Sequence, residues 1–314
     1  MSTTNLENTS EGYVIPSLFE RYKERFKSFW KLFTDSPFGL IGLYLIIAFL
    51  LIGLLAPFLA PYNPSQQNTG GDFETPKLEH PLGTDRNGRD IFSQLVYGTQ
   101  ISLIVGLTAA FIALVIGTLI GLFSGFYGGI IDTLLMRITD FFIQIPALPL
   151  MLTLVMIFGA SLENIILVIG LLGWTRTARV VRSETLSVKE RSYIEATRAI
   201  GAKDRHLIFA HILPNVLPLV TSNAIINVVD AIITEAGLSF LGFGVTEGTF
   251  LGFQISGSWS WGKVLYEAQR DHAMSTGAWW HFLPPGLCLM FLALGFALVS
   301  FSLNEVVNPR LREK

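Results

Sequence analysis

The chain has 314 residues, of which 51% are hydrophobic and 15% are charged, and its mean hydropathy is +0.51. Soluble domains carry about 25% charged residues, so this composition indicates an integral membrane protein. The formal net charge of −2 argues against a nucleic-acid partner. A single cysteine, Cys288, excludes a disulfide within the chain, and its apolar neighbours favour a packed thiol.

The N-terminal arm, residues 1–37, begins with a polar stretch and continues with alternating aromatic and basic side chains over residues 18–33. The aromatic residues recur at steps of three and four positions, with five Lys and Arg between them. This spacing predicts a basic amphipathic helix, which lies either on the inner membrane surface or against the protein itself. We expect no cleaved signal peptide, because the apolar run that follows is long enough to remain as an anchor.

Six long apolar segments follow the arm. Each is close to the ~20 residues that cross a hydrocarbon core of ~30 Å, so the sequence predicts an all-α membrane protein with six transmembrane helices. The expected spans are 38–60, 101–126, 133–158, 164–181, 215–238 and 282–303. The third contains Pro146 and Pro149, and the last turns of the fourth carry Arg176 and Arg179. We expect an external loop at 61–100, a five-helix domain at 101–304 with an inner loop at 182–213, and a tail at 305–314.

Lysine and arginine predict the orientation of these spans. With the N-terminus inside, the inner segments hold 17 of the 22 Lys and Arg residues and the outer segments hold five. Basic residues accumulate on the cytoplasmic side of membrane proteins. The asymmetry therefore places both termini and the 182–213 loop in the cytoplasm.

The most informative segment is residues 192–214, which reads SYIEATRAIGAKDRHLIFAHILP. It is polar, basic and rich in helix-forming residues, although it lies between two apolar spans. Gly201 interrupts the helical pattern, so we expect one helix, a sharp turn and a second short helix. Pro214 fits the first turn of the next helix, where its missing N–H is no loss.

This segment resembles the EAA loop of ABC importer permeases, which reads Glu-Ala-Ala, three residues, Gly, nine residues, Ile, one residue and Leu-Pro. Five residues fall on that pattern: Glu195, Ala196, Gly201, Leu213 and Pro214. Thr197 replaces the second Ala, and His211 stands where the pattern has Ile. The sequence His-Ile-Leu-Pro-Asn at 211–215 is the form used in the peptide/nickel branch of the family.

Three further blocks extend the resemblance over nearly the whole chain from about residue 35. They are His80–Asp85 with Gly88–Asp90, Ser239–Gly244 and Asn308–Leu311. One departure is a Gly- and Ser-rich stretch at 247–260 that is longer than the family leads us to expect.

The resemblance implies a type I ABC importer permease fold in which the inner loop docks into a cleft of an ATP-binding subunit, as a helix enters a groove. The residues expected to couple to the ATPase are Glu195, Ala196, Gly201, Ala202, Asp204, Leu213 and Pro214. It further implies a homologous permease subunit, two cytoplasmic ATP-binding subunits that hold ATP and Mg, and an external solute-binding protein. No catalytic residue, metal site or cofactor is expected in this chain. Peptides are the expected cargo, with nickel complexes and oligosaccharides as alternatives.

Other motifs carry less weight. Residues 257–264 resemble a P-loop, but Val264 stands where Ser or Thr must bind Mg²⁺, so nucleotide binding there is not expected. The five histidines are scattered, and His206 and His211 are five positions apart, a poor spacing for one face of an α-helix. Gly117, Gly121 and Gly125 allow close helix contact, either within the chain or with a second permease.

Two acids near the end of the fifth span are candidate translocation or gate residues. Asp230 is an ionisable group in an apolar span, where such groups are costly and usually functional. It faces either the pathway or a Ser, Thr or Asn of a neighbouring span. Glu235 lies about 140° further around the helix, so the two acids cannot share one task. We expect Glu235 to anchor the outer end of the span.

Two rival classes remain open at this point. An ion-driven secondary transporter predicts an inverted repeat and broken, charged spans. A membrane-embedded enzyme predicts paired His, Asp or Glu side chains at matched depth within the spans, and the sequence places no such pair.

Overall fold

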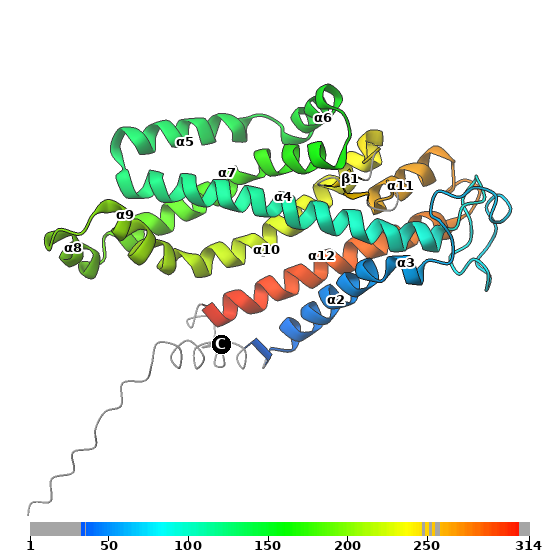
Figure 1. The fold of residues 1–314 in the computed structure, drawn as a ribbon, viewed down its shortest axis with the longest axis horizontal. Coiled ribbons are helices and arrows are strands. Elements are labelled where there is room, and N and C mark those ends of the chain that lie inside the picture. The colour runs from blue at the N-terminus through cyan, green and yellow to red at the C-terminus, as the bar shows by residue number, and fades with distance from the viewer. Residues whose placement is uncertain (1–32, 35, 247–248, 251–252, 255–257, 308–314) are drawn as a thin grey trace, which may run out of the picture.

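The computed structural model describes residues 33–34, 36–246, 249–250, 253–254 and 258–307. Within these ranges, five helical runs are long and apolar enough to cross a membrane, and a bent pair of helices can form a sixth span. Figure 1 shows them running roughly along the long axis of the molecule. The predicted amphipathic helix at 18–33 lies outside the described residues except for its last position. The block Asn308–Leu311 and most of the 247–260 stretch also lie outside them.

The helical elements follow in chain order. They are α2 (Pro37–Leu54), α3 (Ala56–Leu59), α4 (Ile91–Tyr127), α5 (Gly129–Gln144), α6 (Ala147–Phe158), α7 (Leu162–Lys189), α8 (Ser192–Ala199), α9 (Asp204–His206), the π-helix η1 (Leu207–Ile212), α10 (Leu213–Leu238), the π-helix η2 (Ser239–Phe243), α11 (Trp261–Arg270) and α12 (Trp279–Val307). Strands β1 (Thr249–Phe250) and β2 (Phe253–Gln254) form a small antiparallel hairpin, with Thr249 opposite Gln254.

The third predicted span is broken rather than continuous. Helices α5 and α6 meet at an angle of 87°. Ile145, between them, has an extended backbone with φ −78° and ψ 127°. A proline disfavours the α conformation in the residue before it and has no N–H to continue the helix, so Pro146 explains the break.

Two other spans are longer than the apolar pattern indicated. Helix α4 begins at Ile91, ten residues earlier than predicted, because the Asp90 side chain accepts a hydrogen bond from the Ser93 N–H and caps the helix. Helix α7 continues to Lys189, beyond the predicted end at 181, through a polar stretch that forms helix outside the apolar region. The segment between α3 and α4 therefore ends at residue 90 rather than at residue 100.

The helix and the turn predicted for residues 192–201 are confirmed, but the second helix is not the separate short one that we expected. Helix α8 ends at Ala199, Gly201 has φ +90°, and α9 begins at Asp204. Helix α9 then continues through η1 into α10 without a break, so residues 204–243 form one helical run. Pro214 lies in the first turn of α10. The wider π-turn before it suits a proline that donates no hydrogen bond to the preceding turn.

The glycines of α4 pack against α7 within the chain, which decides between the two readings of that stripe. A Cβ on Gly121 would lie 2.6 Å from the Ala178 carbonyl oxygen and 2.7 Å from Val181 Cβ. Gly117 and Gly125 are equally close to Thr177 and Thr185. Such small residues allow two helix backbones to approach closely, so α4 and α7 form the central pair of the bundle.

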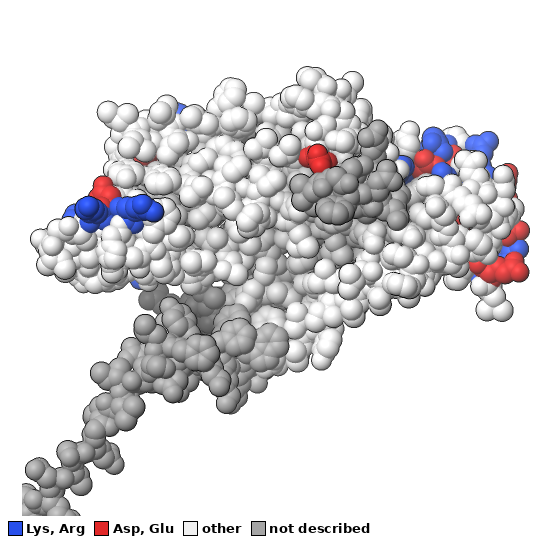
Figure 2. Space-filling model, viewed as in Figure 1, with Lys and Arg blue, Asp and Glu red and all other residues white. Residues whose placement is uncertain are grey.

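The two ends of the molecule differ from its middle. Figure 1 shows α8 and α9 at one end of the long axis, and α3, α11 and the 61–90 segment at the other. On the face shown in Figure 2, most charged side chains gather at these two ends, and the broad band between them carries little charge apart from one acidic group beside the grey atoms. This distribution matches a protein whose middle faces lipid hydrocarbon.

Candidate translocation and coupling sites

The 192–214 segment is held to the spans by a buried apolar cluster. Ile194 of α8 and Leu207, Ile208 and Ile212 of η1 are almost fully buried. They pack together with apolar side chains of α4, α7 and α10, among them Leu122, Phe126, Val181, Val188, Val216 and Val220. This cluster fixes the segment as part of the helical body rather than as a loose loop.

The outward side of the same segment is exposed. Glu195, Ala196, Gly201, Asp204 and Pro214 are exposed, whereas Ala202 and Leu213 are partly buried against the apolar cluster. These are the seven residues predicted to couple to the ATPase, and the structure brings five of them to the surface. The sequence pattern did not single out Ile200, whose 86% exposure makes it one of the most exposed apolar side chains in the described chain.

The turn at Gly201 is open and surrounded by basic side chains. Its φ of +90° favours glycine, and a Cβ placed there would meet nothing within 4 Å. Arg198, Lys203 and Arg205 are exposed beside it. Ile200 and Gly201 therefore form an apolar tip in a basic surround, which we call the Ile200–Gly201 tip.

His206 and His211 lie closer together than their spacing suggested. Their ring centroids are 5.1 Å apart, with the planes at 80°. The prediction that five positions would separate them assumed an α-helix, but this stretch contains the π-helix η1, which has more residues per turn. Within the described residues, no group of three His, Cys, Asp or Glu side chains is arranged to hold a metal ion.

Asp230 lines a small open hollow among α4, α6, α7 and α10. Its Oδ2 lies 3.4 Å from Nη1 of Arg176 on α7. The recorded side-chain partner of Asp230 is thus an arginine rather than the Ser, Thr or Asn of a neighbouring span that the sequence analysis considered. Both charged side chains are more than half exposed, at 57% for Asp230 and 64% for Arg176. The other lining residues are small (Ala109, Ala110, Ala113, Gly173, Ala231), apolar (Met151, Ile169) or weakly polar (Asn227, Thr234).

Two further arginines follow Arg176 at three-residue steps along α7, and each pairs with an aspartate of α5. Arg179 Nη2 lies 2.7 Å from Asp140 Oδ1. Arg182 holds Asp132 through two hydrogen bonds, of 2.5 and 2.6 Å. A forked arginine–carboxylate contact of this kind is both stronger and more directional than a single contact. These two pairs fasten α5 to α7.

Glu235 is fully buried near the C-terminal end of α10. Its Oε1 accepts a 2.6 Å hydrogen bond from Ser239 Oγ of η2, and its Oε2 accepts a 3.3 Å hydrogen bond from Ser102 Oγ of α4. Ser260, the cap of α11, donates in turn to Ser239 Oγ at 3.2 Å. Glu235 thus connects three separate elements and, unlike Asp230, does not reach the hollow.

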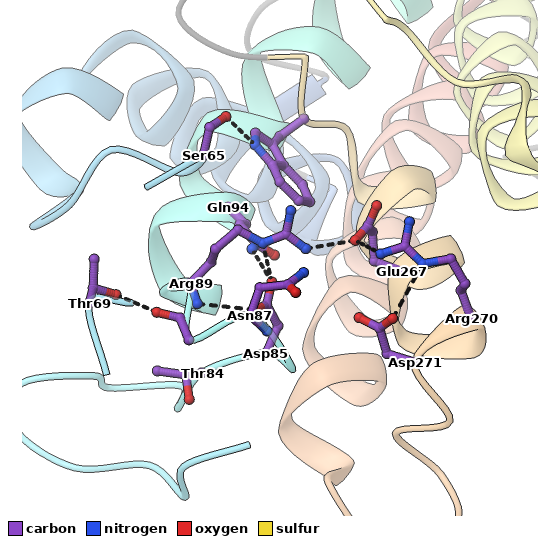
Figure 3. Close-up of polar contacts among 12 residues, drawn as sticks. Ser65, Thr69, Thr84, Asp85, Asn87, Arg89, Gln94, Glu267, Arg270 and Asp271 are labelled. Carbon is purple, nitrogen blue, oxygen red and sulfur yellow. Dashed lines mark hydrogen bonds and ion pairs between the residues drawn. The ribbon is translucent and has the colours of Figure 1, made fainter. Parts of the chain in front are cut away.

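The His80–Asp90 block builds a polar cap at the end opposite α8, shown in Figure 3. Asp85 Oδ1 accepts from the backbone N–H groups of Asn87 and Arg89, and its Oδ2 accepts from Arg89 Nε at 2.6 Å and from Gln94 Nε2 at 2.9 Å. Arg89 also donates through Nη2 to Glu267 of α11 at 2.6 Å. The cap therefore joins the 61–90 segment to α11.

Trp259 and Lys263 complete this cap. Trp259 Nε1 donates to Ser65 Oγ at 3.0 Å, and its ring lies under the guanidinium of Arg89 at 4.7 Å. Lys263, in the stretch that resembles a P-loop, donates to Ser258 Oγ at 2.7 Å. Burial lowers the pKa of Lys263, and the positive charges of Arg89 and Arg270 lower it further, against the opposing effect of Glu267.

Sequence reasoning missed Arg176 as a partner of Asp230, because it was counted among the inner positive charges. It also missed Glu267 and Arg270 of the cap. The sequence does contain a pattern that could have drawn attention to Arg176. Arg176, Arg179 and Arg182 recur at a helical spacing, which predicts one charged face of the helix. The contact between Arg89 and Glu267 could not be found in this way, because 178 residues separate them.

Residues 117–313 match the family model described as "Binding-protein-dependent transport system inner membrane component". Residues 24–77 match the model described as "N-terminal TM domain of oligopeptide transport permease C". The chain therefore belongs to the binding-protein-dependent transport system inner membrane components. It is a multi-pass permease subunit.

The chain is similar to several named permease proteins of this family. The chain is 34% identical to the dipeptide transport system permease protein DppC of Alkalihalophilus pseudofirmus, over 93% of this chain and 90% of that protein. It is 32% identical to the oligopeptide transport system permease protein OppC of Bacillus subtilis, over 94% of each. It is also 32% identical to the glutathione transport system permease protein GsiD of Escherichia coli, over 90% of each.

The fold also has solved counterparts. Two crystal forms of the inward-facing MetNI methionine ABC transporter match with a TM-score of 0.53 at 21% and 20% identity. They cover 70% and 71% of this chain and 97% and 98% of theirs. The likeness confirms the predicted type I importer permease fold.

Proposed function

We propose that this chain is one of two pore-forming subunits of an ATP-driven peptide importer and that cytoplasmic ATP-binding subunits drive it through residues 192–214. The observation that carries the coupling role is the exposed Ile200–Gly201 tip, rigidly mounted on the spans by a buried apolar cluster. An exposed apolar group with charged neighbours is suited to enter a groove of another protein. Glu195 and Asp204 add carboxylates that can pair with basic groups on that partner.

The continuous helical run from Asp204 to Phe243 supplies the mechanical link. A displacement at α9 is carried along one rigid element to α10, which bears both Asp230 and Glu235. When the ATP-binding subunits close on ATP, the docked tip moves with them and the spans rock, which opens the hollow to the outside. Glu235 anchors the outer end of α10 to α4 and η2, whereas Asp230 faces the pathway.

A second, homologous permease completes the pathway. The hollow beside Asp230 is open, and the neighbouring helices α5 and α6 expose Ile130, Leu134, Phe141, Met156 and Ile157. A six-span chain of this kind supplies half of a central cavity, and an unpartnered apolar face beside the cavity suits a related subunit. ATP and Mg are held by the partner subunits, and this chain performs no catalysis.

The same proposal fixes the orientation. Figure 1 places the start of α2 and the end of α12 toward the end of the molecule that carries α8, which supports cytoplasmic termini. The polar cap of residues 61–90 and α11 is then external, where a solute-binding protein delivers cargo. Under this proposal the division into arm, first span, external segment, five-helix domain and tail stands, with the external segment ending at residue 90 instead of 100.

Peptide cargo is favoured because the named relatives transport dipeptides, oligopeptides and glutathione. A nickel complex or an oligosaccharide carried by the same machinery is the alternative. An ion-driven transporter is more remote, although the broken third span is a feature that such proteins share.

Reconstitution tests the proposal. Liposomes that contain this chain, its companion permease, both ATP-binding subunits and the loaded solute-binding protein should accumulate peptide only with ATP. Omission of the companion permease should abolish uptake. Full ATP-dependent uptake without a second permease would refute the heterodimer, and uptake driven by an ion gradient without ATP would refute the importer.

A further inference from the structure

We propose that Arg176 and Asp230 form a contact site for cargo that carries both a carboxylate and an ammonium group, as a peptide with free ends does. This inference rests on the proposed peptide importer function and adds to it a site within the spans. The carboxylate of the cargo would pair with Arg176, and its ammonium group would pair with Asp230.

The geometry of the pair leaves both groups able to bind a ligand. A single 3.4 Å contact joins Arg176 to Asp230, whereas Arg179–Asp140 is joined at 2.7 Å and Arg182–Asp132 by two contacts of at most 2.6 Å. A guanidinium has five N–H donors, and the structure records one hydrogen bond from Arg176 among the described residues. A carboxylate has about four acceptor positions, so Asp230 also keeps free capacity.

The Arg176–Asp230 pair is also more exposed than the two neighbouring pairs, Arg179–Asp140 and Arg182–Asp132. The exposure of the arginines falls along α7 from 64% at Arg176 to 50% at Arg179 and 33% at Arg182. The charges at the hollow are thus the ones least covered by their own chain. Charged side chains within membrane spans are costly and usually functional, so an exposed pair in this position indicates a function that uses it.

The remaining lining is small or apolar apart from two polar side chains. Ala109, Ala110, Ala113 and Gly173 are small. Asn227 donates to Thr177 Oγ1 and Thr234 donates to the Asp230 carbonyl, so each can still offer its side-chain oxygen as an acceptor. Among the described residues that line the hollow there is no aromatic side chain, the group against which sugar rings commonly stack. The site therefore fits a zwitterion better than an oligosaccharide.

Blocking one end of the cargo at a time tests this pairing. We would measure ATP-dependent uptake of trialanine, N-acetyl-trialanine and trialanine amide by the complete transporter in liposomes, for wild type, Asp230→Asn and Arg176→Gln. The solute-binding protein has its own preference among these peptides, but that preference cancels when each variant's uptake ratio is divided by the wild-type ratio.

We expect Asp230→Asn to lower trialanine uptake about tenfold, the size of one charge-assisted hydrogen bond. It should also lose the sensitivity to N-acetylation while it keeps the sensitivity to C-terminal amidation. Arg176→Gln should show the converse. Asp140→Asn and Arg179→Gln, which alter the adjacent pair outside the hollow, should keep both sensitivities. Yield of the assembled complex and its ATPase rate should be unchanged in the Arg176 and Asp230 variants.

Two results would overturn the inference while leaving the importer intact. One is a wild-type pattern of sensitivity in both Asp230→Asn and Arg176→Gln. The other is a loss of complex yield in these variants that the exchanged pair, Arg176→Asp with Asp230→Arg, restores together with normal uptake, because that behaviour belongs to a structural ion pair. A wild-type complex that hydrolyses ATP but takes up none of the three peptides would overturn the peptide cargo and this site together.

Discussion

Arg89 and Glu267 lie 178 residues apart in the chain, yet Nη2 of Arg89 is 2.6 Å from Oε2 of Glu267. The same carboxylate oxygen accepts a second hydrogen bond, also of 2.6 Å, from Arg270. The first arginine is buried in the polar cap and the second is about half exposed. Because both donors lie at the same distance from one acceptor, a difference in stability between their variants reflects burial rather than the length of the hydrogen bond.

We therefore predict that Arg89→Ala destabilises the protein by about 3 kcal/mol, since it removes the buried positive charge that pairs with the buried carboxylates of Asp85 and Glu267. Arg270→Ala should lower stability by less than about 1 kcal/mol, because solvent screens an exposed pair. Thermal unfolding of the detergent-solubilised chain measures both changes. Equal losses in the two variants would contradict a structural role for the cap.

Glu235 provides a second test of stability. Glu235→Leu removes the acceptor for the hydroxyls of Ser102 and Ser239, and we expect a loss of about 1–3 kcal/mol from these buried groups. Glu235→Gln keeps an acceptor oxygen and should lose much less. If Glu235 were instead a pathway residue, Glu235→Gln would lower uptake in liposomes with no change in the unfolding temperature.

Much of this architecture was predictable because the sequence marks membrane spans by long apolar runs and turns by helix-breaking residues. The length of each apolar run predicted the number of spans, and the helix-breaking Gly201 predicted the turn between α8 and α9. The break at Pro146 was underestimated, since a proline in a transmembrane helix is often tolerated and only the tertiary setting decides. The start of α4 at Ile91 depends on a cap by Asp90 that apolar periodicity does not register.

The candidate sites were predictable to a smaller extent. Asp230 stood out as a charge in an apolar span, but its partner Arg176 lies 54 positions away on another helix. The contact thus depends on how α7 and α10 pack, which local patterns do not encode. For the same reason, the sequence did not predict the buried environment of Glu235, whose hydrogen-bond partners come from α4 and η2.

The coupling role of the 192–214 segment leads to a prediction with a matched control. Gly201→Asp forces a left-handed residue with a charged side chain into the tip, and Glu195→Lys reverses an exposed charge. Both should reduce association with the ATP-binding subunits, with membrane insertion intact. Gly277 has a similar φ, +75°, and equally open surroundings, but it precedes α12 at the opposite end.

Gly277→Asp should therefore strain the backbone to a similar degree and leave ATPase association normal. Co-purification of the ATP-binding subunits with each variant from membranes gives the readout. Normal recovery with both Gly201→Asp and Glu195→Lys would rule out docking through this segment.

The most direct measurement of the central claim is a cross-link from the tip itself. A photoreactive amino acid at Ile200, 86% exposed, can be compared with one at Leu78, which is fully exposed at the opposite end. In membranes that contain the assembled transporter, the Ile200 probe should cross-link to an ATP-binding subunit and the Leu78 probe should not. A transporter active in ATP-dependent uptake whose Ile200 probe forms no such adduct, or whose Leu78 probe forms it instead, would contradict the account.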